Sequence, residues 1–191
     1  MPTSFSMTIC GIEELAGHNQ AGFTHVLSIL DPQWPVPEAF GAYGEHERLE
    51  LRFDDIIEET PGMIAPQASD VRALLDFGRD LMAEPGANLL VHCHAGVSRS
   101  TASMLLILAQ ARPDLGAEAV AAEILRIRAK AWPNLRIVEL GDAALGRGGT
   151  LASAVIGLYR EQLARRPELG EFMTEAGRAR EVALAGGASS G

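Results

Sequence analysis

The stretch from Asn88 to Leu108 constrains the fold of this chain more than any other part of it. It begins with an apolar run, residues 88–91, that predicts a buried strand, and from Arg99 onward it reads as an apolar helix. Cys93 therefore begins a tight turn from strand to helix. Successive backbone N–H groups in such a turn, together with the positive end of the helix, form a cradle for a tetrahedral anion. The stretch thus predicts a phosphate-binding loop.

Side chains of this loop have the chemistry of a cysteine nucleophile and its partners. A thiol at a helix N-terminus beside an arginine loses its proton more readily than a free cysteine, so we expect Cys93 to attack phosphorus. Arg99 is forked and always charged, which suits it to hold two phosphoryl oxygens. Ser100 is placed to hydrogen-bond the sulfur and ease its departure, whereas His92 points to the opposite face of the strand and supports the loop. The loop residues expected to bind the phosphate with Arg99 are His94, Ala95, Gly96, Val97 and Ser98, and Gly96 gives the backbone its freedom.

The run from His92 to Ser100 resembles the signature loop of the protein tyrosine phosphatase superfamily, H-C-x5-R-[ST]. Its inner part, residues 95–100, is most similar to the dual-specificity and bacterial tyrosine phosphatase branch. The resemblance covers roughly residues 5–165 and implies the fold of a cysteine-dependent phosphatase. A zinc site at residues 92–94 is a weaker interpretation, because adjacent strand residues point to opposite sides and the chain has no second Cys/His cluster.

Two aspartates follow an upstream strand. Residues 46–53 alternate between apolar and charged side chains, which predicts a half-buried strand, and Asp54 and Asp55 come directly after it. In the resembling family, the acid that protonates the leaving oxygen lies in a loop at this position. Continued alternation directs Asp55 inward, so Asp55 is our expected general acid and Asp54 a supporting residue. The alternative is that the pair only ends the strand and solvates a turn.

Periodicity predicts an α/β fold with a small, largely parallel central sheet and helices on both faces. The predicted strands are 5–9, 25–30, 46–53 and 88–91, and the predicted helices are 11–22, 69–84, 99 onward, 116–129, 135–145 with Asn134 as its cap, and 150–163 with Thr150 as its cap. Residues 5–165 form the phosphatase domain. Residues 166–191 form a C-terminal helix and tail without an assigned function, and residues 186–191 have the composition of a disordered end. In the proline-rich loop 31–37, Trp34 is expected to pack within its loop rather than to line a cleft.

Composition limits the partners and the compartment. The 191 residues suit one domain, and a net charge of −9 argues against nonspecific binding to nucleic acid or to an anionic membrane. Only two cysteines are present, which excludes a disulfide framework and suits a reducing compartment. Residues 1–10 lack the pattern of a signal peptide, and no apolar run approaches 18 residues, so we expect a cytoplasmic protein.

The predicted reaction is phosphomonoester hydrolysis through a cysteinyl phosphate, with Asp55 acting first as acid and then as base. The expected partner is a phosphorylated protein, chiefly at phosphotyrosine with phosphoserine and phosphothreonine as further candidates, or a small phosphoester. No cofactor or metal is expected, since Arg99 and the loop amides supply the charge stabilisation. The alternatives are an inositol-phosphate or other small-molecule phosphatase, a non-catalytic phosphoprotein-binding module, and a sulfur transferase of the rhodanese type.

Overall fold

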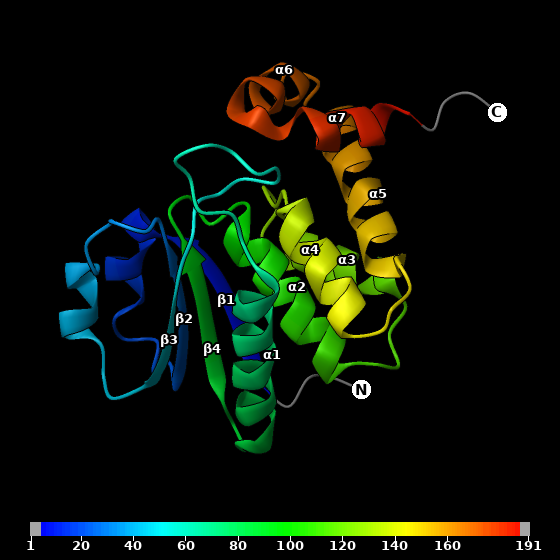
Figure 1. The fold of residues 1–191 in the computed structure, drawn as a ribbon. Helices are drawn as coiled ribbons and strands as arrows, with labels where there is room; N and C mark the ends of the chain where they lie inside the picture. Colours follow the sequence, from blue (N-terminus) through cyan, green and yellow to red (C-terminus); the bar gives the residue numbers. More distant parts are fainter. Residues whose placement is uncertain (1–4, 188–191) are drawn as a thin grey trace.

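A four-stranded parallel sheet forms the centre of the molecule (Figure 1). The computed structural model describes residues 5–187. The strand order is β1-β4-β2-β3, so the largely parallel sheet predicted from the sequence is parallel throughout. The strands are β1 (Ser6–Gly11), β2 (His25–Leu30), β3 (Glu47–Arg52) and β4 (Asn88–Cys93).

The sequence of each strand agrees with its place in the sheet. The two central strands, β2 and β4, are buried along almost their whole length and read as nearly continuous apolar runs. The edge strand β3 instead alternates, with Leu51 buried and its neighbours Glu50 and Arg52 partly exposed. Because β4 lies between β1 and β2, Cys93 ends a central strand at the carboxyl edge of the sheet, where ligands of open α/β folds bind.

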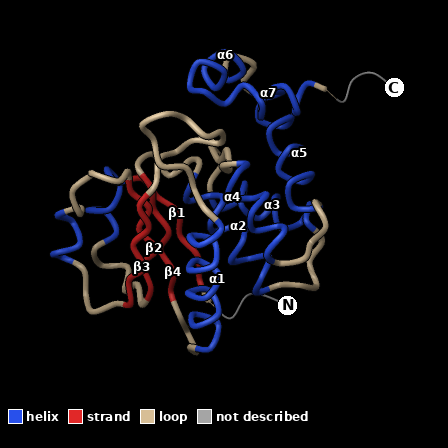
Figure 2. The backbone as a smooth tube through the Cα atoms, viewed as in Figure 1, coloured by secondary structure: helices blue, strands red, loops and turns tan. Residues whose placement is uncertain are grey.

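Helices cover both faces of the sheet, as predicted, but the two faces differ (Figures 1 and 2). One face carries a layer of α-helices whose apolar sides form the large core of the molecule. These helices are α1 (Ala68–Ala83), α2 (Arg99–Ala111), α3 (Ala117–Ile127), α4 (Leu135–Ala144) and α5 (Thr150–Arg165). The other face carries two short 3₁₀ helices, η1 (Ile12–His18) and η2 (Glu38–Ala42), over a smaller core that includes Leu15 and Phe40.

Two local predictions need correction. The helix predicted at residues 11–22 is only the 3₁₀ helix η1, because this short segment offers a single buried apolar anchor, Leu15, and 3₁₀ geometry is typical of short pieces. Thr150 does not cap α5. Gly149 stands at the cap with φ +86°, and the carboxylate of Asp142 accepts the amides of Gly149 and Leu151. The side chain of Asp142, on α4, thus caps α5 in place of Thr150.

The chain continues past α5 in three short helical pieces. They are α6 (Leu169–Met173), the π-helical turn η3 (Thr174–Arg178) and α7 (Ala179–Gly186). In Figure 1 they lie at the end of the molecule where the strands end. Gly177, at φ +78°, interrupts the helical backbone, so the C-terminal helix predicted from the sequence is broken into short pieces. The sequence predicts a disordered end at residues 186–191. Gly186 is instead the last residue of α7, and residues 188–191 lie outside the described part.

Within residues 5–187, no helix combines the length and the apolar composition needed to cross a membrane.

Candidate active site

The loop after β4 holds the predicted nucleophile at its base. Cys93 is the last residue of β4 and is 2% exposed, and its Sγ lies 3.2 Å from the hydroxyl of Ser100 in the first turn of α2. The six residues between them form one tight turn. A hydroxyl at this distance can donate a hydrogen bond to the sulfur, as the sequence predicts.

The backbone of the loop is oriented so that its carbonyls point away from the cradle. The carbonyls of residues 94–98 accept hydrogen bonds from surrounding elements, whereas no amide of residues 95–98 donates to another residue in the described range. The donors to these carbonyls are Ile12 N, Arg128, Thr101, Trp132 N, Asn134 N and Ala102 N. The loop amides are therefore free to bind the oxygens of an anion.

Arg128 supports this loop from behind. It donates to the carbonyls of Gly96 and Ala95, and its guanidinium pairs with both carboxylate oxygens of Glu14. The hydrogen bonds from Arg128 lower the pKa of Glu14 to about 2. Gly96 is required here, because its φ is +65° and a Cβ would lie 2.6 Å from the carbonyl oxygen of Cys10. These contacts hold the loop in one conformation.

Arg99 is anchored by one of its three nitrogens. Its Nη1 donates to Asp31 Oδ1 and to the carbonyl of Phe53, both at 2.7 Å, and the residue is 3% exposed. The other edge of the guanidinium is different: Nε is buried without an acceptor among the described residues, and no described residue accepts a hydrogen bond from Nη2. The Nε and Nη2 edge is thus available for the two-oxygen fork that the sequence predicts.

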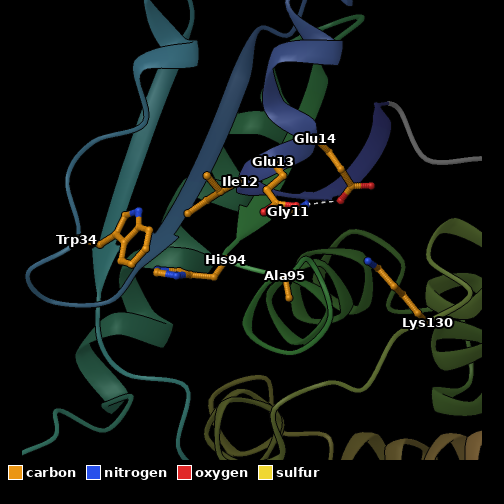
Figure 3. A pocket seen from close by; sticks show the side chains of 8 residues that line it. All are labelled: Gly11, Ile12, Glu13, Glu14, Trp34, His94, Ala95 and Lys130. Carbon is orange, nitrogen blue, oxygen red and sulfur yellow. Dashed lines mark hydrogen bonds between the residues drawn. The ribbon is translucent and has the colours of Figure 1, made fainter.

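His94 and Trp34 line a pocket beside the loop. Asp31 N donates to His94 Nε2 at 3.1 Å, and the rings of Trp34 and His94 meet edge to face with centroids 4.5 Å apart. Burial, and then the charge of Arg99, lower the pKa of His94. Trp34 remains 46% exposed, so the expectation that it packs within its own loop is wrong. The pocket has a volume of about 640 Å³, and Figure 3 shows Trp34 and His94 on one side of it and Lys130 on the other.

The two aspartates have different environments. Asp55 Oδ1 accepts hydrogen bonds from Ser98 Oγ at 2.7 Å and from Asn134 Nδ2 at 2.9 Å, which joins Asp55 to the cradle loop. Asp54 instead closes its own loop, because its Oδ2 accepts the amide of Ile64 at 2.6 Å. The inward direction predicted for Asp55 therefore agrees with this geometry.

His92 is fully buried behind the loop. Its Nε2 lies 2.7 Å from the hydroxyl of Ser28 on β2, and its ring faces the side of the sheet with the smaller core, where Phe40 lies. Burial lowers the pKa of His92 to about 4, so its ring is neutral at pH 7. These contacts agree with the expectation that His92 supports the loop.

Several residues at the site were not predicted from the sequence. Asp31 directly follows β2, and a polar residue at the carboxyl end of a central strand is a signal that could have identified it. Glu14, Arg128 and Arg178 offer no such signal, because each reaches the site from a segment distant in sequence. Asn134 caps α4 as predicted, but its contact with Asp55 was missed. Among residues 5–187, no cluster of three or more His, Cys, Asp or Glu side chains could hold a metal ion.

Comparison with known proteins gives one relative in sequence. No family model matches the chain. Dual specificity protein phosphatase 26 of Bos taurus is 31% identical over 104 residues, which cover 51% of this chain and 46% of the relative. The match thus spans about half the length of each protein.

Solved structures give the same fold. Human DUSP28 has a TM-score of 0.57 at 18% identity, covering 77% of this chain and 97% of that chain. The PTP-2 phosphatase of Cydia pomonella also has a TM-score of 0.57, at 20% identity, covering 72% of this chain and 84% of its own. The chain is therefore similar, in its fold and over half its sequence, to the dual-specificity phosphatases of the protein tyrosine phosphatase superfamily, which confirms the resemblance predicted from the Cys93 loop.

Proposed function

We propose that the protein hydrolyses phosphomonoesters of phosphotyrosine proteins, with phosphoserine and phosphothreonine as further substrates, through a cysteinyl phosphate. One arrangement carries this proposal: Cys93 lies at the base of a loop of free amides, beside an Arg99 edge without acceptors. Asp55 is held to the same loop through Ser98. The residues expected to act as nucleophile, oxyanion donors and acid thus belong to one site, which supports phosphoryl transfer.

In the first step, the thiolate of Cys93 attacks phosphorus while the bond from phosphorus to the ester oxygen breaks. Asp55, protonated at this stage, gives its proton to that oxygen, so the product leaves as an alcohol or phenol. The loop amides and the free edge of Arg99 stabilise the charge on the three equatorial oxygens. The result is a phosphoryl group on sulfur and a carboxylate on Asp55.

In the second step, a water molecule attacks the phosphorus and the bond from sulfur to phosphorus breaks. The Asp55 carboxylate accepts the proton of this water, which restores the acid for the next cycle. Ser100 donates a hydrogen bond to the departing thiolate, whose Sγ lies 3.2 Å from its hydroxyl. Inorganic phosphate is released, and the enzyme returns to its initial state.

The charges around the cradle support a substrate with one phosphate rather than several. The loop itself contributes little positive charge beyond Arg99, because the lowered pKa of His94 favours its neutral ring at pH 7. Asp54 lines a pocket of about 360 Å³ together with Asp31, whose own charge is paired with Arg99. A polyphosphorylated inositol needs several cations around the loop, whereas a phosphorylated tyrosine presents its charge only to the cradle.

We also propose a cytoplasmic location. Both cysteines, Cys10 and Cys93, are free thiols. The reaction needs Cys93 reduced, and a reducing compartment maintains it in that form.

Hydrolysis of a substrate panel tests the proposed function. The purified protein is assayed in the presence of a chelator with phosphotyrosine, phosphoserine and phosphothreonine peptides, an inositol phosphate, and thiosulfate with cyanide. We expect release of phosphate chiefly from the phosphotyrosine peptide. Preference for the inositol phosphate would contradict the substrate class, and thiocyanate formation without phosphate release would indicate sulfur transfer. Binding of phosphopeptides without turnover would indicate a binding module.

A further inference from the structure

Arg178 reaches the candidate active site from the C-terminal segment. It is the last residue of η3, and its side chain is 4% exposed. Its Nη1 donates to Asp55 Oδ1 at 3.2 Å and to Ser98 Oγ at 3.0 Å. One nitrogen thus contacts both the expected acid and the cradle loop, from a position 123 residues after Asp55.

A buried carboxylate fixes the position of Arg178. Glu181, on the first turn of α7, is 0% exposed and accepts a hydrogen bond of 2.7 Å from Arg178 Nη2. The same carboxylate accepts the indole N–H of Trp132 at 2.6 Å and the amide of Leu135 at 2.9 Å. These two residues flank Asn134, which itself donates to Asp55. The C-terminal segment and the turn before α4 therefore hold Asp55 as one connected unit.

The hydrogen bonds on Asp55 distinguish its two oxygens. Ser98, Asn134 and Arg178 all donate to Oδ1, and no residue in the described range donates to Oδ2. A proton on a carboxyl group occupies an oxygen that is not already an acceptor of strong donors. Oδ2 is therefore the oxygen that is left to carry a proton, and the donors on Oδ1 fix the orientation of the carboxyl group.

Stability alone does not account for Arg178. Its Nε is buried without an acceptor among the described residues, which is a costly state for a charged group. Replacing a buried ion pair by apolar residues of similar size is often neutral or stabilising. A buried arginine aimed at the expected acid is more readily explained by the reaction than by the fold.

We propose that Arg178 is a positioning residue for the general acid: it holds Asp55 Oδ1 against Ser98, so that Oδ2 delivers the proton to the leaving oxygen. The inference rests on the proposed phosphatase function and adds the C-terminal segment to the machinery of the reaction. Arg178 touches no substrate in this account and acts through Asp55 and through Ser98, the hydrogen-bond partner of Asp55.

Leaving-group dependence tests this role. Arg178→Gln is compared with the wild-type full chain on phenyl phosphate, whose leaving oxygen needs a proton, and on an activated aryl phosphate, whose phenol leaves unaided. We expect kcat on phenyl phosphate to fall roughly 10- to 100-fold, because small misplacements of a catalytic group have effects of this size. The rate on the activated ester should change much less. A merely structural role would lower both rates alike and overturn the proposal.

A double-mutant cycle adds a second test. If Arg178 acts through Asp55, Arg178→Gln should have little further effect on phenyl phosphate in an Asp55→Asn background. If the two substitutions lower the rate on phenyl phosphate independently, so that the loss in the double variant is the product of the two single losses, the proposal is contradicted. Arg180→Gln is the matched control, since Arg180 lies on the same segment but pairs with Glu139 and Glu58. It should leave the ratio of the two rates unchanged.

A conservative variant keeps the test decisive if Arg178→Gln does not fold. Lysine retains the charge, but its single nitrogen cannot contact Asp55 and Glu181 with the geometry of the guanidinium fork. Arg178→Lys should show the same selective loss on phenyl phosphate in a smaller degree, and an equal loss on both esters would overturn the proposal. A wild-type protein that hydrolyses neither ester would instead reject the proposed function, so the two failures are distinguishable.

Discussion

Asp55 Oδ1 accepts a hydrogen bond of 2.7 Å from the hydroxyl of Ser98, a residue of the cradle loop 43 positions further along the chain. The contact ties the loop after β3 to the loop after β4 along the carboxyl edge of the sheet, where β2 lies between these two strands. The neighbouring residue Asp54 makes a different contact, because its carboxylate accepts a hydrogen bond from the amide of Ile64. The two aspartates should therefore differ in their effect on the reaction.

The first prediction decides between the two aspartates. Asp55→Asn should lower the rate on phenyl phosphate by about 10²–10⁴-fold and affect an activated aryl ester much less, because only the poor leaving group needs a proton. Asp54→Asn should have a smaller effect on both esters through the loop. Leaving-group dependence in the Asp54 variant alone would assign the acid to Asp54, and its absence in both would locate the acid elsewhere.

The second prediction concerns the guanidinium of Arg99, which Asp31 and Phe53 hold in place. Arg99→Lys should be severely impaired, because a lysine nitrogen is a point charge that cannot present two parallel N–H groups to the phosphoryl oxygens. Asp31→Asn should have an intermediate effect, since Nη1 keeps its hydrogen bond to Phe53 O at 2.7 Å. Steady-state kinetics and inhibition by inorganic phosphate measure both variants. Near-normal values for Arg99→Lys would contradict the two-oxygen geometry.

The third prediction separates the two chemical steps. With the hydroxyl of Ser100 3.2 Å from the sulfur, Ser100→Ala should slow the breakdown of the cysteinyl phosphate more than its formation. Rapid mixing with an aryl phosphate should then show a burst of phenol followed by slow turnover. Equal slowing of both steps, without a burst, would make Ser100 a structural residue of the helix start.

The fourth prediction concerns stability below neutral pH. The pKa of His92 is lowered from 6.5 in the unfolded chain to about 4 in the folded protein by burial. The folded state therefore binds fewer protons, so the contribution of neutral His92 is complete above pH 6.5 and is lost as the pH falls towards 4. The free energy of unfolding should decrease over this range by at most about 3 kcal/mol from this residue.

Denaturant unfolding of wild-type protein and His92→Asn between pH 7.5 and pH 4 measures this effect. The wild type should lose more stability than the variant as the pH falls, and His46→Asn, at a partly exposed position of the chain, should follow the wild type. Parallel curves for the wild type and His92→Asn would show that His92 takes no part in the acid sensitivity.

Local parts of the fold and site are predictable from the sequence because their determinants are local. Cys93, Gly96 and Ser100 lie within one strand-to-helix turn, so the residue types alone indicate the cradle. The direction of Asp55 follows from the alternation of the strand that precedes it. Asn134 caps α4 through a bond to the amide of Ile137, three residues away, which is a short-range pattern.

Other parts depend on tertiary contacts that leave no periodic signal. The capping of α5 by Asp142 instead of Thr150 depends on how α4 and α5 pack together. The support of Gly96 by Arg128 joins residues 32 positions apart. The contact between Arg178 and Asp55 depends on the path of a segment that is broken at Gly177 and lacks clear helical periodicity. Such pairs are found only when the fold brings them together.

Trapping of the intermediate tests the central claim, phosphoryl transfer through Cys93, most directly. A phosphotyrosine peptide carrying radiolabelled phosphate is mixed with wild-type protein, Ser100→Ala and Cys93→Ser, and the reaction is quenched with acid and digested. We predict label on the peptide that contains Cys93, more of it in Ser100→Ala, and none in Cys93→Ser, which should still bind the substrate without turnover. Sustained turnover by Cys93→Ser, or label on a different residue, would contradict the account.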